Sequence, residues 1–123
     1  MKYLLVFLLT ISAAYADTDF SNYKKYTLTD KEAMALREAI GEQMKDPDSV
    51  RFRSKKVKAI RDGDQISACV EFNAKNSYGG YGDPSIAVVF MSKGGKGFIY
   101  PIISGMDAFK LPSCIAQELK WRE

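Results

Sequence analysis

Two cysteines, Cys69 and Cys114, constrain the fold of this chain more than any other feature. They are the only cysteines among 123 residues, and an even number in an oxidising compartment favours a disulfide. The bond would close a loop of 46 residues, counting both cysteines, and restricting the unfolded chain in this way stabilises the fold by about 4 kcal/mol. The alternative is a redox-active pair, which usually has a C-x-x-C spacing that this sequence lacks. We therefore expect a structural disulfide, provided that the chain is exported.

The first sixteen residues have the three regions of a secretory signal peptide. Lys2 supplies the positive charge, an apolar run follows at residues 4–11, and Ala14-x-Ala16 fits a signal-peptidase site before Asp17. The alternative is a buried N-terminal helix, since the run is too short to span a bilayer, which needs roughly 20 residues. We expect cleavage after Ala16, a periplasmic or secreted protein, and no transmembrane anchor after cleavage.

The composition excludes several classes of function. Histidine is absent, which excludes an imidazole base, a Ser-His or Cys-His nucleophile pair and a histidine-ligated metal site. After removal of residues 1–16, the remaining 107 residues carry 17 Lys and Arg against 15 Asp and Glu, a balance of +2. This excess is too small to indicate nucleic-acid binding by itself. We therefore expect no cofactor, no metal and no nucleic-acid partner.

The start of the mature chain predicts an extended arm at residues 17–29, followed by a single α+β domain at residues 30–123. Thr29 and Glu32 fit a capping box, and apolar residues at helical spacing follow them. Pro47 ends this pattern, because the residue before a proline avoids the helical region. The sequence therefore predicts an N-terminal helix over residues 30–45.

Alternating apolar residues predict an antiparallel meander sheet of three or four strands after this helix. The alternation is loose in the first strand, with a break or bulge expected near Ser54, and a hairpin turn follows at Asp62-Gly63-Asp64. A proline at position 101 places the last strand at an edge or a bulge. The expected strands cover residues 50–60, 66–74, 85–91 and 98–103.

A short C-terminal helix is expected over residues 111–121, with Ile115 and Leu119 on its inner face. Cys69 points away from Val70 in an alternating strand. If the first helix covers the Val70 face of the sheet, the second helix should cover the Cys69 face and be held there by Cys114. The sequence thus predicts helices on both faces of one sheet.

The connection between the second and third expected strands is the most informative candidate site. It is too long for a tight hairpin and combines three glycines, two tyrosines and several amide or hydroxyl side chains, which are enriched in binding surfaces. The alternative is a structural loop whose asparagines bond its own backbone and whose tyrosine rings cover the sheet edge. The candidate binding residues in this segment are Asn73, Lys75, Asn76, Ser77, Tyr78, Tyr81 and Asp83.

Three parts of the chain carry a family resemblance. They are Asp46-Pro-x-Ser49-x-x-Phe52, then Cys69, then the string Asn73-Ala-Lys-Asn-Ser-Tyr-Gly-Gly-Tyr81. Together they resemble a family of small exported bacterial and phage-associated proteins of uncharacterised function. The resemblance covers roughly residues 46–90, and Val70 stands where the family pattern has a glycine after the cysteine. It implies export and a shared loop, and it implies no activity and no catalytic residue.

A basic run, Arg51 to Arg61, is the second candidate site. Alternate residues of a strand share one face, so such a stripe could meet an anionic envelope component or an acidic protein. The alternative is an edge strand whose charges prevent pairing with another chain. The candidate binding residues in the run are Arg51, Arg53 and Lys55.

These features favour an exported binding domain that captures a protein or a cell-envelope ligand through residues 73–84, together with the neighbouring basic strand. An enzyme is not expected. The alternative is a small hydrolase or accessory factor that acts on cell-wall or glycan material through Glu71 or Asp83, because carboxylates can do hydrolytic work in pairs. A third class is a structural module that interacts through its sheet edge.

Overall fold

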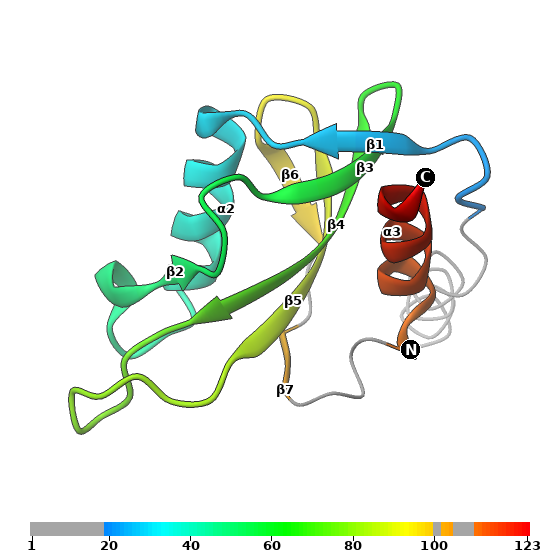
Figure 1. Ribbon diagram of the computed structural model, residues 1–123. Helices are drawn as coiled ribbons and strands as arrows, with labels where there is room; N and C mark the ends of the chain where they lie inside the picture. Colours follow the sequence, from blue (N-terminus) through cyan, green and yellow to red (C-terminus); the bar gives the residue numbers. More distant parts are fainter. Residues whose placement is uncertain (1–18, 100–101, 105–109) are drawn as a thin grey trace, which may run out of the picture.

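The computed structural model describes residues 19–99, 102–104 and 110–123. In this part of the chain, seven strands form one antiparallel sheet, with a helix on each face (Figure 1). The strand order is β1-β3-β4-β5-β6, while β2 also pairs with β4 and β7 also pairs with β5. The α+β fold is therefore confirmed. The elements are β1 (Lys24–Thr27), α2 (Asp30–Gly41), the 3-10 helix η1 (Pro47–Ser49), β2 (Arg51–Phe52), β3 (Lys58–Asp62), β4 (Gln65–Asn73), β5 (Ser85–Ser92), β6 (Lys96–Ile99), β7 (Ile102–Ser104) and α3 (Pro112–Arg122).

The sheet is wider than the predicted meander of three or four strands. Part of the expected arm is an edge strand, because β1 pairs antiparallel with β3 from Lys24↔Arg61 to Thr27↔Lys58. The predicted last strand is two strands, β6 and β7, with Pro101 between them. The predicted signal peptide lies outside the described residues. In the described ranges, no helix is long and apolar enough to cross a membrane.

Helix α2 begins where the capping box predicts. The Glu32 backbone N–H donates to Thr29 Oγ1 at 3.1 Å, and the Thr29 N–H donates to Glu32 Oε1 at 2.9 Å. The helix ends at Gly41, four residues before the predicted end. Gly41 is buried, and a Cβ there would lie 3.0 Å from the Pro47 carbonyl oxygen. This position therefore suits a glycine, whose lack of a Cβ lets Pro47 pack closely against the end of the helix.

Glu32 also joins α2 to two distant elements. It is 1% exposed, and its carboxylate accepts hydrogen bonds from the Tyr26 hydroxyl at 2.7 Å and from the Gly94 backbone N–H at 2.8 Å. Burial raises the pKa of this carboxyl, but the hydrogen bonds from Gly94, Thr29 and Tyr26 lower it by more, so the pKa lies below its usual value. One side chain thus joins β1, α2 and the β5–β6 turn.

The main core lies between α2 and one face of the sheet. Leu36 and Ile40 are fully buried and belong to the same apolar cluster as alternate residues of β4 and β5. The period-two alternation predicted for residues 66–74 is therefore confirmed, and strand β5 is buried on both faces as its sequence suggests. The strand residues of this cluster are Ala59, Ile66, Ala68, Val70, Phe72, Ala87, Val89 and Met91.

A break separates β2 from β3, as predicted near Ser54. Phe52 pairs with Phe72 and Ile60 with Ser67, so the eight steps from Phe52 to Ile60 stand opposite only five steps along β4. The three extra residues loop out, and among the described residues no strand pairs with the middle of β4 on this side. This gap lies beside Cys69.

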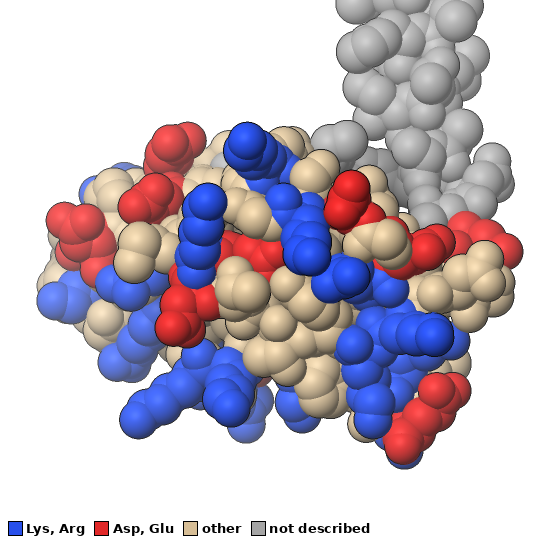
Figure 2. Space-filling view, turned by 90° about the horizontal axis from the view of Figure 1, so that it is seen from above, with Lys and Arg blue, Asp and Glu red and all other residues tan. Residues whose placement is uncertain are grey.

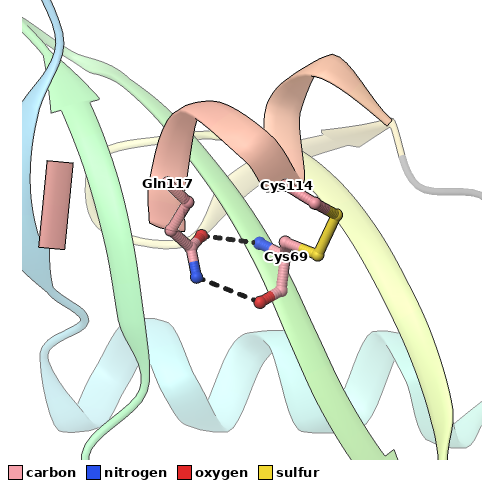
Figure 3. The surroundings of a disulfide bond; sticks show 3 residues. All are labelled: Cys69, Cys114 and Gln117. Atoms are coloured by element: carbon pink, nitrogen blue, oxygen red, sulfur yellow. Dashed lines mark hydrogen bonds between the residues drawn. A yellow bond between two sulfur atoms is a disulfide. The ribbon is translucent and has the colours of Figure 1, made fainter. Parts of the chain in front are cut away.

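Helix α3 covers the gap through a disulfide and a side-chain amide (Figure 3). Cys69 is bonded to Cys114, with a Cα–Cα distance of 5.2 Å. The Gln117 side chain accepts from the Cys69 N–H at 2.8 Å and donates to the Cys69 carbonyl at 3.1 Å, as a neighbouring strand residue would. The Trp121 indole N–H donates to the Ala59 carbonyl at 2.8 Å. The predicted disulfide and the position of the second helix on the Cys69 face are confirmed.

The predicted inner face of α3 is wrong. Ile115 and Leu119 are 44% and 55% exposed, whereas Cys114, Gln117 and Trp121 contact the sheet. Those three residues are spaced three and four apart and lie on one side of a helix. The disulfide and the two polar contacts therefore determine which side of α3 faces the sheet. The spacing of its apolar residues does not.

Candidate functional site

The β4–β5 connection, residues 74–84, forms a structured hairpin end that we call the tip. Lys75 and Tyr81 form an isolated antiparallel bridge, and the Asn76 N–H donates to the Gly80 carbonyl at 2.8 Å. Asn76 Oδ1 accepts from the backbone N–H groups of Tyr78 at 2.9 Å and Gly80 at 3.3 Å. Gly79 has φ +81°, in the left-handed region that favours glycine. The Asn76 side chain and the backbone thus fix the shape of the tip.

The base of the tip is held by a residue outside the candidate list. Ser49 Oγ accepts from the Lys75 N–H at 2.8 Å and donates to the Asp46 carbonyl at 2.7 Å. On the other side, the Asn73 amide donates to the Gly82 carbonyl at 3.4 Å. The turn around Ser49 and the tip around Lys75 are therefore in contact. The sequence did not mark Ser49 as a site residue, because its contact with Lys75 joins residues 26 positions apart.

The two tyrosines of the tip have different environments. Tyr78 is 97% exposed, whereas Tyr81 is 37% exposed and lies against a cation from β2. Asn76 behaves as the structural alternative expects, because it bonds its own loop. Tyr78 does not, because its ring covers no part of the sheet edge. The tip is both structurally fixed and open to a partner.

The basic strand and the tip meet at Tyr81. The Arg51 guanidinium carbon lies 3.6 Å from the Tyr81 ring centroid, and Lys75 Nζ lies 6.0 Å from it. Arg51 pairs with Asn73 across β2 and β4, which brings the strand beside the tip. Cation–π contact orients the guanidinium, while its edge stays accessible for hydrogen bonds. Residues from two separately predicted sites thus form one surface.

An open groove of about 430 Å³ adjoins this surface. Arg53 Nη1 lies 2.9 Å from Glu71 Oε2 within it, so an arginine is paired with this carboxylate. Asp83 does not line the groove, and no group of three or more His, Cys, Asp or Glu in the described ranges could hold a metal ion. The groove is lined by Arg51, Phe52, Arg53, Glu71, Asn73 and Pro84.

Three predicted site residues are not brought into this cluster. Lys55, Ser77 and Asp83 are exposed, and within the described part of the chain their side chains form no hydrogen bond or ion pair. The basic run is also divided by the break after β2. Lys58 lies 5.1 Å from the Trp121 ring centroid and Arg61 lies 5.1 Å from that of Tyr26, both away from the tip.

Comparisons of this chain with protein-family models, with curated proteins and with solved structures find no match.

Proposed function

We propose that the protein is an exported, periplasmic binding domain that captures a protein or cell-envelope ligand through its tip and the adjoining residue Arg51. The observation that carries this proposal is the 97% exposure of Tyr78 on a hydrogen-bonded hairpin end. A tyrosine ring offers a large apolar contact area together with a hydroxyl, and it loses little side-chain entropy on binding. The disulfide supports the export part of the proposal, because such bonds persist in oxidising compartments.

The geometry supports preorganised binding. The loop conformation is fixed before contact by Asn76 and by the Lys75–Tyr81 bridge, so a partner would not have to order it. Arg51 adds a stacked guanidinium, and tyrosine and arginine are among the side chains that most often dominate interface energies. The surface thus combines one exposed ring with one oriented cation.

The hydrolase alternative has less support from this geometry. A carboxylate pair is needed for that chemistry, and the groove contains Glu71 bonded to Arg53 while Asp83 lies outside its lining. The third class, interaction through a sheet edge, would not require an exposed tyrosine at a hairpin end. Binding at the tip is the function that uses the observed arrangement.

Replacing Tyr78 by alanine is expected to reduce capture of a partner from envelope extract at least tenfold, because the change removes the most exposed ring of the surface. The unfolding temperature should stay unchanged, since the ring is almost fully exposed. Met34→Ala is the matched control, because Met34 is 63% exposed on α2, away from the tip. A partner captured equally by the wild type and by Tyr78→Ala would contradict the proposal.

A further inference from the structure

A second surface lies at the β1 edge of the sheet, where the other half of the basic run meets the C-terminal helix. Figure 2 views the molecule from the side on which β1 lies, and Lys and Arg side chains spread across it, with carboxylates interspersed among them. Arg122 pairs with Glu118, and Lys120 donates to the Ser21 carbonyl. Of the six cations that form this surface, five have no ion pair in the described ranges, and Arg122 is the exception. We call this surface the basic face, formed by Lys24, Lys25, Lys58, Arg61, Lys120 and Arg122.

The single tryptophan of the chain lies beside two cations of the basic face. Lys58 Nζ is 5.1 Å and Lys25 Nζ 6.0 Å from the Trp121 ring centroid. The indole N–H is bonded to the Ala59 carbonyl, and this hydrogen bond orients the ring. Two like charges beside one ring repel each other, and no carboxylate in the described ranges pairs with either. An incoming anion would relieve this repulsion.

A cavity of about 340 Å³ opens beside Trp121. The Cys69–Cys114 disulfide, Gln117 and the indole line it, together with Lys58 and Arg122. Glu118 also lines it, where it is paired with Arg122. The cavity volume lies within the range of small-ligand sites and suits one polar headgroup rather than a long chain.

We propose that the basic face docks the protein on a bilayer surface rich in anionic phospholipid, with one phosphate headgroup entering the cavity between Lys58 and Arg122. Clustered Lys and Arg attract anionic headgroups, and a tryptophan at the same level is typical of a membrane interface. The cations spread from β1 to α3. This arrangement fits an extended anionic surface as the ligand better than it fits a single free anion. The proposal does not depend on the tip.

A nucleic acid fits the same face less well. Single-stranded nucleic acids bind through aromatic rings on which bases stack. The Trp121 ring lies beside two ammonium groups and is fixed at the sheet, and Tyr26 lies under Arg61 with its hydroxyl bonded to Glu32. Neither ring stands free as a stacking platform, so phospholipid is the ligand class that the face favours.

Co-sedimentation with phosphatidylglycerol vesicles, at low and high salt, tests the proposal on the full exported protein. Binding should shift the Trp121 fluorescence, weaken as salt rises, and be absent with phosphatidylcholine vesicles. The double variant Lys25→Gln/Lys58→Gln should bind at least tenfold more weakly, since each lysine near an anionic surface contributes about fivefold. Lys31→Gln/Lys45→Gln removes the same charge from exposed positions on and after α2 and should bind within about twofold of the wild type.

Equal weakening by the two double variants would overturn the proposal, because net charge alone would then explain binding. A fluorescence shift with a single-stranded oligonucleotide but not with vesicles would also overturn it and assign the face to nucleic acid. Tyr78→Ala should bind vesicles as the wild type does, so failure at the basic face and failure at the tip are distinguishable.

Discussion

Replacing Cys69 and Cys114 together by alanine is expected to lower the free energy of unfolding by about 4 kcal/mol, because a loop spanning 45 positions is no longer closed in the unfolded chain. For a domain of this size the unfolding temperature falls by roughly 20 °C. Gln117 and Trp121 still bond α3 to β4 and β3, so the variant is expected to fold. Urea unfolding measured by circular dichroism gives both the stability and its denaturant slope.

Chemical reduction of the wild type is the matched comparison and should give the same loss, since it opens the same loop without changing a side chain. The denaturant slope should rise in both cases, because the unfolded chain becomes more extended. Identical unfolding curves for oxidised and reduced protein would contradict a stabilising Cys69–Cys114 bond.

Glu32→Gln lowers the free energy of unfolding by about 3 kcal/mol, the second large effect expected. Glu32 Oε1 accepts from the Thr29 N–H and the Tyr26 hydroxyl, and Oε2 accepts from the Gly94 N–H. A glutamine has one acceptor oxygen, so its NH₂ group would face at least one of these donors. Urea unfolding at neutral pH measures the loss. Glu38→Gln on the exposed side of the same helix is the control and should change stability by less than about 0.5 kcal/mol.

The stability loss caused by Glu32→Gln is expected to depend on pH. The pKa of Glu32 is lower in the folded protein than in the unfolded chain, so its charge stabilises the fold above the unfolded value of about 4.3. That contribution is lost as the pH falls through the folded pKa. The stability difference between the wild type and Glu32→Gln should therefore shrink below about pH 4, and a difference that stays constant in acid would contradict this role.

Features that depend on neighbouring residues were predictable from the sequence. The capping box at Thr29 and Glu32 and the hairpin turn at Gly63 are local geometries, and both lie where expected. The alternation of apolar and polar residues around Val70 predicted on which face of the sheet each β4 side chain lies, because successive side chains of a strand point to opposite faces. If the chain is exported, the disulfide between Cys69 and Cys114 was predictable without structural information, because the sequence contains no other cysteine.

Features that depend on distant contacts were not predictable. The pairing of Lys24 with Arg61 turns a polar arm into a strand, and polar residues at an edge have no periodic pattern to reveal it. The contact of Glu32 with Gly94 joins residues 62 positions apart. The inward face of α3 follows from Gln117, which fills a gap that exists only because β2 and β3 are separate.

The candidate site was also predictable only in part. Glycine and tyrosine content located the tip, and it was reasonable to expect the basic strand beside it. The stacking of Arg51 on Tyr81 needs the three-dimensional pairing of β2 with β4, and the support from Ser49 comes from a different turn. The division of the basic run between the tip and the β1 edge follows from the break after Phe52.

The central claim is that the domain presents a tip that is already structured before any partner binds. Backbone ¹⁵N order parameters of the free protein test it most directly, because they report motion at each amide of the tip. The hydrogen bonds of Asn76 predict values for Tyr78 and Gly80 close to the rigid-backbone value of about 0.85 that strand β4 should show. Values below about 0.6 at these two amides, with β4 rigid, would contradict a preformed tip.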